Sequence, residues 1–423
     1  MFFAHVGGNF NNGANDGVFY WHLNNTSGNA NINIGSRLLM EQIKRILFSI
    51  ALAKNMPRTD GVSRETETPI GKHKKNMKRY SNIFKDIVTK QNVISAIHKA
   101  SKRKKKRKSV QKILLNDEEY AEKICEMLEN KTYKPSPYIV SKIYDGARHK
   151  ERTIYKPKFY PDQIIHWALM NQIDRILYKR FYHYSCASIK GRGTKHGIKA
   201  IKKAMKDSRY KYCLKMDIKQ FYPSIDKEKL KEKFRRVFKD DDLLWLIDTI
   251  IDGNETQGSG IPIGNYTSQW FANFYLTDLD VFIKQKLKIK HYVRYMDDLI
   301  IFHTNKRKLR KTKEEIEIFL KNENLSVKNN WQIFCIDKRM LDFLGFRFYR
   351  DHTTLRRANF LRIKRRFKKI YKKGCLSYKD ACAVISYNGL LKHSNCNNYM
   401  RKYLYPYISL KKCRKVVSDE SKK

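Results

Sequence analysis

The chain has 423 residues, which is too long for one hydrophobic core and predicts two to four subdomains. Lysine and arginine number 89 against 41 aspartates and glutamates, giving a net charge of +48. An excess of this size, spread through the chain, indicates a polyanionic partner, nucleic acid before membrane. A content of 41% hydrophobic and 13% aromatic residues suffices for packed cores, which excludes a disordered basic tail.

The sequence carries no sign of membrane insertion, secretion or cysteine pairing. No apolar run approaches the roughly 18–20 residues of a membrane span. The N-terminus MFFAHVGGNF lacks the basic flank and apolar core of a signal peptide. The eight cysteines form no C-x-x-C pair and predict free thiols in a reducing cytoplasm, not a zinc site or a disulfide framework.

Residues 1–37 differ in composition from the rest of the chain, because they are rich in Asn and Gly and contain no lysine. This pattern is typical of turns and short strands, too small to fold alone. Residues 38–55 predict a helix, and residues 57–76, which are polar and contain Pro and Gly, predict a linker. We therefore expect the main folded part of the chain to begin near Met77.

From Met77 the sequence becomes helical and basic. Eight of the ten residues at 99–108 are Lys or Arg, which is usually a solvated face, although so dense a run repels itself unless phosphates screen it. The candidate nucleic-acid-binding residues in this run are Lys104, Lys105 and Arg107. The next predicted elements are a helix to Leu128 capped by Asn116 or Asp117, a basic hairpin over 139–162, a helix over 163–181 and a Gly-punctuated loop over 185–198 that leads into another helix.

The second half of the chain alternates predicted strands and helices. In chain order these are a core strand over 212–217, helices within 227–251, a Gly/Pro loop feeding one long helix over 257–287, a hairpin over 291–303, a charged helix over 306–321, a strand pair, LDFLGFRFYR at 341–350, and a helix over 355–373. The last helix has an apolar stripe and a basic face, with Arg362, Arg365 and Arg366 as candidate nucleic-acid contacts. After Gly374 we expect a loop-rich tail.

Three carboxylates lie at the ends of predicted strands. Asp297 and Asp298 occupy the tip of the hairpin in HYVRYMDDLIIFH, and Asp217 ends the strand that opens KMDIKQFYPSID. Acids that converge in this way repel each other unless divalent metals with an oxygen preference neutralise them. Nucleotidyl transfer uses two metals about 4 Å apart, which such a set can hold. The alternative is a surface hairpin with solvated acids, and we expect a fourth acid, Asp226, to cap the following helix.

From about Met77 to near Tyr405 the sequence resembles the reverse transcriptases, through the Asp217 motif, the Tyr-Met-Asp-Asp box and FLGF in this order. The resemblance implies an α+β right-hand polymerase with fingers, an antiparallel ferredoxin-like palm and a short helical thumb. It also implies RNA-directed DNA polymerase activity with two Mg²⁺ ions. The metal site would consist of Asp217, Ile218, Asp297 and Asp298, with Asp217, Asp297 and Asp298 as the catalytic acids.

The same resemblance implies contacts to the incoming nucleotide and the primer. Tyr222 would block a ribose 2′-hydroxyl, or Phe221 if the register slips by one. Arg152, followed by Lys150 and Arg148, would contact the triphosphate. Leu344-Gly345 resembles the primer grip. We expect template RNA, a DNA primer or cDNA, and dNTPs as partners.

The loop IPIGNYTSQ at 261–269 resembles that of reverse transcriptases from diversity-generating retroelements. Ile263 takes the place of the Gln found in most reverse transcriptases, and Ile263, Gly264 and Gln269 are candidate nucleotide contacts. Such enzymes copy a template-repeat RNA while misreading adenines, and loss of polar contacts is consistent with loose selection. The alternatives are a packing substitution in a faithful enzyme, a retron, group II intron-type or phage-defence reverse transcriptase, and a non-catalytic RNA-binding protein.

The resemblance also offers an origin for residues 1–37. GVFYWHLNNTSGNANINIGSRL resembles the end of the variable repeat in C-type-lectin-fold target proteins, which suggests translated template sequence; a real appended domain and a low-complexity tail stay open. The family further implies a small basic accessory ring protein and a cytoplasmic, bacterial or phage-encoded enzyme. The expected division of the chain is 1–37 repeat-like segment, 38–76 helix and linker, 77–205 fingers, 206–350 palm and 351–423 basic helical thumb and tail.

Overall fold

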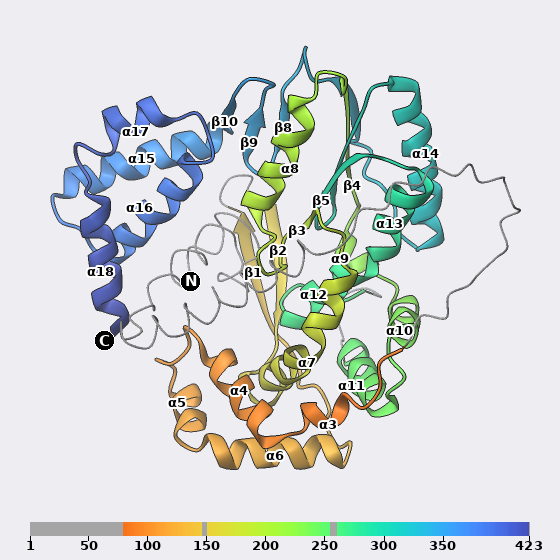
Figure 1. Ribbon diagram of the computed structural model, residues 1–423. Coiled ribbons are helices and arrows are strands. Elements are labelled where there is room, and N and C mark those ends of the chain that lie inside the picture. Colours follow the sequence, from red (N-terminus) through yellow and green to blue (C-terminus); the bar gives the residue numbers. More distant parts are fainter. Residues whose placement is uncertain (1–78, 146–149, 254–259, 423) are drawn as a thin grey trace, which may run out of the picture. The chain divides into compact units, whose positions relative to one another are not determined.

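The computed structural model describes residues 79–145, 150–253 and 260–422 (Figure 1). The predictions for residues 1–37 and 38–76, for the turn of the 139–162 hairpin and for Arg148 lie outside these residues, as does the side chain of Lys150. Within the described part of the chain no helix is long and apolar enough to cross a membrane. The cysteines described there are all free thiols, as the sequence predicts.

The first described region is helical, with one hairpin. Its helices are α3 (Phe84–Ile87), α4 (Lys90–Ser101), α5 (Lys108–Leu115), α6 (Asp117–Glu129) and α7 (Ile164–Arg180), the last preceded by a turn at Phe159–Gln163. Helix α7 buries the predicted positions Ile165, Leu169, Ile173 and Leu177, so the apolar spacing is confirmed. Helix α6 begins at the predicted residue, but Asn116 does not cap it, because its side chain donates back to the Lys112 carbonyl.

The basic hairpin is confirmed as two antiparallel strands. Strand β1 (Ile139–Asp145) pairs with β2 (Lys150–Lys156), and Ile143 lies opposite Arg152. Only Ile154 of these strands is buried among the hydrophobic residues, whereas Ile139 and Val140 are exposed. The hairpin therefore stands out from the core on most of its described surface and presents Lys142 and Arg152 to solvent.

A five-stranded sheet lies at the centre of the fold, in the order β3-β5-β6-β4-β7. Its strands are β3 (Ser185–Cys186), β4 (Tyr212–Asp217), β5 (His291–Tyr295), β6 (Asp298–His303) and β7 (Gln332–Cys335). Strands β5, β6, β4 and β7 are antiparallel, and β3 adds a parallel edge. Residues 299–302 of β6 are all buried, so both faces of the sheet are covered at its middle.

Helices surround this sheet. They are α8 (Thr194–Lys206), α9 (Phe221–Ser224), α10 (Lys227–Arg235), α11 (Asp241–Asp252), α12 (Tyr266–Tyr275), α13 (Thr277–Val281), the π-helical turn η3 (Phe282–Lys286) and α14 (Lys306–Asn322). Helix α8 contacts β3 and β5, and α14 contacts β4, β6 and β7. Asp226 caps α10 by accepting from the Lys229 amide, as predicted. The single long helix predicted to 287 is instead three consecutive segments that change geometry at Leu276 and Phe282.

A second sheet connects the central sheet to the C-terminal helices. Strands β8 (Leu341–Phe343), β9 (Phe346–Phe348) and β10 (Thr353–Leu355) are antiparallel in the order β10-β9-β8. Arg356 forms an ion pair with Asp342, and Asn395 bonds the backbone of Thr353 in both directions. The C-terminal helices are therefore attached to this sheet at two points.

The loop-rich tail predicted after Gly374 is wrong. Helix α15 (Arg357–Lys373) is followed by α16 (Tyr378–Leu391), α17 (Asn397–Tyr403) and α18 (Leu410–Lys422), and α16 packs against both α15 and α18 (Figure 1). Eleven of the fourteen residues of α16 are buried, so it has no polar face from which a helical period could be read. The described residues of the region predicted as a short helical thumb and tail therefore contain four helices where the sequence predicted one.

One hydrophobic core joins the N-terminal helices to the central sheet. Its buried residues run from α3 and α4 through α7, α12 and β6 to Leu325. The backbone of β3 and the packing of α8 place residues 185–205 with the sheet, although the sequence assigned them to the fingers. The strand ends that carry the acids thus lie on a framework that both regions support.

Candidate active site

The three predicted acids lie at one end of the central sheet. Asp217 of β4 is the direct cross-strand partner of Asp298 of β6, and Asp297 occupies the turn between β5 and β6. The Ile218 amide donates to the Asp297 carbonyl at 3.1 Å, which fastens the turn to the end of β4. Met296, which precedes Asp297, has a φ of 53°, a left-handed conformation that the tight turn requires. The fold therefore brings together two chain segments eighty residues apart.

The electrostatics of this end are those of crowded carboxylates. Burial, together with the neighbouring charges of Asp298 and Asp217, raises the pKa of Asp297 to about 7. The ammonium of Lys328 pairs with the Asp217 carboxylate, and the Lys328 amide donates to the Asp217 carbonyl at 2.8 Å. A lysine thus supplies part of the positive charge that the sequence assigned to metals.

The groups present fit a magnesium site in their chemistry. Carboxylate and carbonyl oxygens are what Mg²⁺ prefers, and Asp217, Asp297 and Asp298 supply them. The Ile218 carbonyl points to the Asp297 side, because in extended backbone it shares the direction of the Ile218 amide that bonds Asp297. Within the described residues no three His, Cys, Asp or Glu side chains are assembled as a finished metal site.

Of the two aromatic residues that follow Asp217, Phe221 lies in the hydrophobic core and Tyr222 lies beside the acidic turn. Phe221 is 3% exposed and belongs to the hydrophobic core, whereas Tyr222 is partly exposed and its hydroxyl lies 3.9 Å from the Met296 sulfur. The Tyr222 carbonyl accepts from the Ile261 amide at 3.0 Å. Tyr222 therefore stands between the acidic turn and the loop that begins the IPIGN segment.

The 261–265 loop is joined to the basic hairpin through main-chain atoms. The Tyr155 amide of β2 donates to the Ile263 carbonyl at 2.8 Å. Gly264 has a φ of 151°, and a Cβ built on it would lie 1.8 Å from the Tyr155 carbonyl oxygen, so only glycine fits. Asn265 is buried and donates to the Tyr138 hydroxyl at 2.7 Å, while Ile263 keeps a partly exposed side chain.

Gln269 is not a nucleotide contact in this structure. It lies in α12 and is 1% exposed, because the whole helix is buried from Thr267 to Tyr275. Arg152 has an exposed side chain on β2, three residues before the Tyr155 contact with the loop. Two of the predicted nucleotide contacts, Ile263 and Gly264, belong to the 261–265 loop, and Tyr222 bonds that loop at Ile261. Arg152 is exposed on the neighbouring hairpin.

Half of the predicted nucleic-acid contacts face the protein itself. Lys104 bonds Gln163 and lies 5.7 Å from the Phe159 ring, and burial, reinforced by Arg107, lowers its pKa to about 8. A further two of these predicted contacts lie on α15. Arg362 is half-buried and donates to Asn359, and Arg366 forms an ion pair with the buried Asp380 at 2.5 Å. Each of these three side chains already has a protein partner, and its contact with phosphate stays a prediction.

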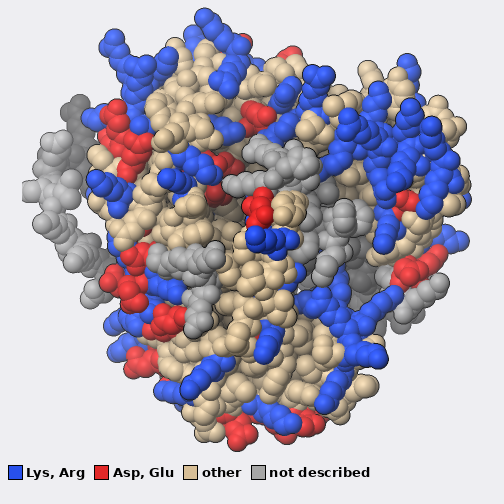
Figure 2. All heavy atoms as spheres, turned by 180° about the vertical axis from the view of Figure 1, so that it is seen from behind, with Lys and Arg blue, Asp and Glu red and all other residues tan. Residues whose placement is uncertain are grey.

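Lys105, Arg107 and Arg365 are exposed, as a phosphate contact requires. Arg365 belongs to a row of exposed basic residues along α15, made up of Arg357, Lys364, Arg365, Lys368, Lys369, Lys372 and Lys373. Figure 2 shows lysine and arginine side chains gathered over the C-terminal helices, at the upper right of the view. This row is the densest exposed positive charge that we identify on a described helix.

The FLGF segment forms the tip of a hairpin. Leu344 and Gly345, with φ of 54° and 82°, make the two-residue turn between β8 and β9. Leu344 packs close to Gly197 of α8, and Arg356 and Asn359 donate to the Gly345 carbonyl. The predicted primer-grip segment is thus held rigidly between α8 and the start of α15.

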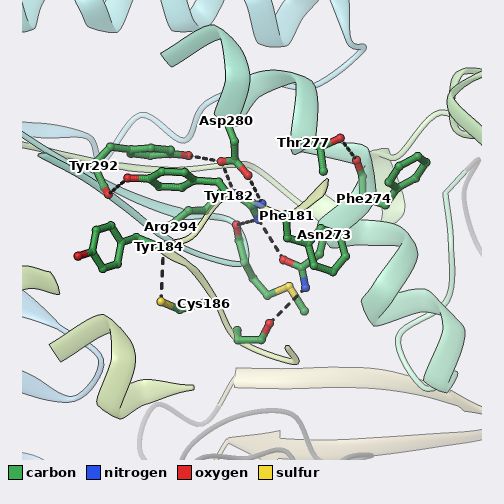
Figure 3. Close-up of polar contacts among 12 residues, drawn as sticks. Phe181, Tyr182, Tyr184, Cys186, Asn273, Phe274, Thr277, Asp280, Tyr292 and Arg294 are labelled. Carbon is green, nitrogen blue, oxygen red and sulfur yellow. Dashed lines mark hydrogen bonds and ion pairs between the residues drawn. The ribbon is translucent and has the colours of Figure 1, made fainter. Parts of the chain in front are cut away.

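The sequence did not point to two groups that hold the acidic turn. One is Lys328, whose pairing with Asp217 spans 111 residues of sequence. The other is Arg294 of β5, which is fully buried and bonds Asp280, Asn273 and the Met296 carbonyl (Figure 3). A signal for Arg294 was present, because an arginine inside a strand of buried residues requires a buried acid as partner.

Residues 149–348 match the family model described as reverse transcriptase (RNA-dependent DNA polymerase). This segment is a reverse transcriptase domain. It contains strand β2 of the basic hairpin, the whole central sheet and the three acids, and it ends with β9. The α+β fold and the antiparallel strands around the acids agree with the expected polymerase palm.

A curated relative of this reverse transcriptase domain is the retron Ec73 reverse transcriptase of Escherichia coli, which is 32% identical over 175 residues. The match covers 38% of this chain and 52% of the relative, so the chain spans about half the length of the relative that it matches. Among solved structures, telomerase from Candida albicans is 11% identical with a TM-score of 0.44, covering 74% of this chain and 65% of that one. Apo telomerase from Candida tropicalis is 12% identical with a TM-score of 0.45, covering 68% and 62%.

Proposed function

We propose that this protein is an RNA-directed DNA polymerase that extends a DNA primer on an RNA template with dNTPs. The observation that carries the proposal is the pairing of Asp217 with Asp298 beside the turn residue Asp297, inside the reverse transcriptase domain. The raised pKa of Asp297 supports it, because strongly perturbed carboxylates in a cluster are typical of functional sites.

Asp217, Asp297 and the Ile218 carbonyl would hold two Mg²⁺ ions, with Asp298 in support. When bound, these ions lower the pKa of the primer hydroxyl and stabilise the charge on the triphosphate. The chain itself keeps the carboxylates in place through β4, β6 and the Ile218 amide. The Lys328 ammonium shields the Asp217 charge in the metal-free protein.

The nucleotide would enter between the acidic turn and the 261–265 loop. Tyr222 would face its ribose, Ile263 and Gly264 would line its base, and Arg152, with Lys150, would approach the triphosphate from the hairpin. The RNA and the growing cDNA would be held through phosphate contacts by exposed basic side chains such as Lys105, Arg107 and Arg365.

For the template, two classes have separate support. The partly exposed apolar side chain at Ile263 supports an error-prone enzyme of a diversity-generating retroelement, because it offers no polar group to discriminate the pairing base. The similarity to a retron reverse transcriptase supports a structured non-coding RNA as template. An adenine-variant repeat pair beside the gene favours the first, and a structured RNA gene favours the second.

The test is primer extension on an RNA template with full-length protein. Asp217→Asn and Asp297→Asn should each reduce extension to less than about a hundredth of wild type, a loss of a few kcal/mol of transition-state stabilisation. RNA affinity should change little, because it depends on dispersed lysines and arginines. Asp226→Asn, which alters a helix cap and a bond to Asn324 but none of the three clustered acids, is the matched control and should extend normally.

A chain without any extension activity that still binds RNA would support the non-catalytic alternative. Sequencing the cDNA separates the two template classes, since an excess of errors opposite template adenines is expected only for the mutagenic enzyme. The small basic accessory ring protein stays a prediction from the resemblance. Adding it to the assay should increase template specificity if the prediction is right.

A further inference from the structure

A fully buried arginine lies directly beneath the acidic turn. Arg294 is 0% exposed and Asp280 of α13 is 2% exposed, and they form a two-pronged ion pair with N–O distances of 2.9 and 2.6 Å (Figure 3). The Tyr292 hydroxyl donates to the same carboxylate at 2.9 Å. The charge of Arg294 is therefore balanced by Asp280, and the Asp280 carboxylate accepts further from Tyr292, although all three groups lie in the apolar interior.

The guanidinium has one nitrogen left for other partners after it has bound Asp280. That nitrogen donates to the Asn273 side-chain oxygen at 3.1 Å and to the Met296 carbonyl at 3.2 Å. Asn273 is fixed in turn, because its amide nitrogen donates to the Ala187 and Gln269 carbonyls. Arg294 thus connects α12, α13 and the turn between β5 and β6 through one planar group.

The Met296 carbonyl belongs to the peptide unit that leads into Asp297. The Met296 amide donates to the Cys186 carbonyl of β3 at 3.3 Å, and the Asp297 carbonyl accepts from the Ile218 amide. With Arg294 on the Met296 carbonyl, the peptide units on both sides of Asp297 are held. Because the peptide units before and after Asp297 are both held, the direction of the Asp297 side chain is held as well. Met296 adopts the left-handed φ of this turn.

A buried ion pair is a poor means of stabilising a fold, because apolar side chains of similar volume often do as well. Apolar side chains cannot donate a hydrogen bond to the Met296 carbonyl, whereas an arginine paired with an acid can. What the pair contributes here is therefore a hydrogen-bond donor of fixed direction at a fully buried position. This is the arrangement by which indirect partners orient ligands of a metal.

We propose that Arg294, oriented by Asp280 and Asn273, is the positioning residue that fixes the Asp297 turn for metal binding and nucleotidyl transfer. The inference depends on the proposed function, because it assigns Asp297 a part in holding the metals. It adds to that function a buried residue that orients the turn from the side facing away from the proposed substrates. Arg294 itself touches no substrate.

The experiment compares full-length variants by two readouts. Arg294→Met combined with Asp280→Leu removes the ion pair without leaving a lone buried charge, and Arg294→Lys keeps the charge but not the planar fork. Tyr292→Phe is the matched control, because it removes a bond to the same carboxylate and none to the turn. Mn²⁺ binding is measured by electron paramagnetic resonance, and kcat and KM for dNTP are measured by primer extension, with circular dichroism and RNA binding as measures of folding.

The double variant should fold and bind RNA, yet its Mn²⁺ affinity and its kcat should each fall about 10- to 100-fold. KM for dNTP should stay within about threefold, since the nucleotide loop is untouched. Arg294→Lys should fold and show the same two losses in smaller measure, and Tyr292→Phe should resemble wild type. If the double variant unfolds, Arg294→Lys decides alone.

Mn²⁺ affinity and kcat within twofold of wild type in the folded variants would overturn the inference and leave the proposed function standing. A wild-type protein that neither binds Mn²⁺ nor extends a primer would overturn both. A wild type that binds Mn²⁺ but does not extend, with variants that lose the binding, would retain the positioning role of Arg294 for the metal site and remove the proposed activity.

Discussion

Replacing Asp297 with Asn should stabilise the metal-free protein at pH 8, although it should abolish catalysis. Burial and the charges of Asp298 and Asp217 raise the pKa of Asp297 to about 7 from the ordinary value of 3.8. A carboxyl whose pKa is higher in the folded than in the unfolded chain stabilises the fold while it is protonated. This contribution is complete below the unfolded pKa and is lost as the pH rises through about 7.

The size of the effect follows from the two pKa values. A difference of about three units corresponds to about 4 kcal/mol as an upper limit, at 1.36 kcal/mol for each unit. In the presence of EDTA the wild type should therefore lose up to about 4 kcal/mol of unfolding free energy between pH 4 and pH 8 through this group. Asp297→Asn has no charge to bury and should not show this loss.

The assay is urea unfolding, followed by circular dichroism at several pH values with EDTA and with saturating Mg²⁺. Mg²⁺ should remove most of the difference by stabilising the wild type. Asp226→Asn is a control for which the opposite effect is expected. Burial raises the pKa of Asp226, but hydrogen bonds from the Lys229 amide and Asn324 outweigh burial and hold this pKa below 3.8. That control should lose stability above pH 4. A destabilised Asp297→Asn protein at pH 8 in EDTA would refute the reasoning.

Three further predictions follow from the contacts described above. Gly264→Ala should cost at least about 2 kcal/mol of stability or tenfold in kcat, measured by unfolding and extension, because its Cβ would collide with the Tyr155 carbonyl. Arg365→Gln should weaken RNA binding and lower its salt dependence by about one phosphate contact. Arg366→Gln should mainly lower the melting temperature, because it removes the shorter of the two ion pairs to the buried Asp380 and leaves only the longer one to Lys373. A chain that starts at Met77 should extend primers like the full chain, because the sequence predicts that residues 1–37 are too small to fold alone and that residues 57–76 are a linker.

Each of these predictions has a matched comparison. Gly191→Ala also substitutes a left-handed glycine, with a φ of 78° and nothing within 4 Å of the new Cβ, so it should cost only about 1 kcal/mol. Equal effects of Gly264→Ala and Gly191→Ala would contradict the collision argument. Equal salt dependence of RNA binding for the two arginine variants would contradict their assignment, and loss of folding in the shortened chain would make residues 1–76 integral.

The elements that the sequence predicted best are those in which local pattern and burial agree. Strands β4 and β6 were predicted to the residue or within a few, because a mainly apolar run ends at Asp217 in β4 and another follows Asp298 in β6. Helix α16 was missed because burial on all sides removes the period on which prediction depends. The basic row on α15 was predicted, but not that Arg366 faces a buried acid, since that pairing is set by a neighbouring helix.

The same limit applies to the candidate site. The acids could be located from their motifs, because strand ends and a tight turn are local features. Lys328 and Asp280 could not, because their roles depend on which distant segments the fold brings against Asp217 and Arg294. Gln269 was misassigned for a related reason, since a polar residue in a loop motif can begin a buried helix.

The bond between the Tyr155 amide and the Ile263 carbonyl fixes the backbone at position 263, whatever side chain that position carries. The backbone there is fixed by atoms that every residue at position 263 would also possess. The side chain, which is partly exposed, makes no contribution to that bond. Position 263 can therefore be exchanged without moving the hairpin or the loop. If Ile263 lines the base as proposed, one substitution at this position would change the accuracy of copying while the rest of the polymerase keeps its form.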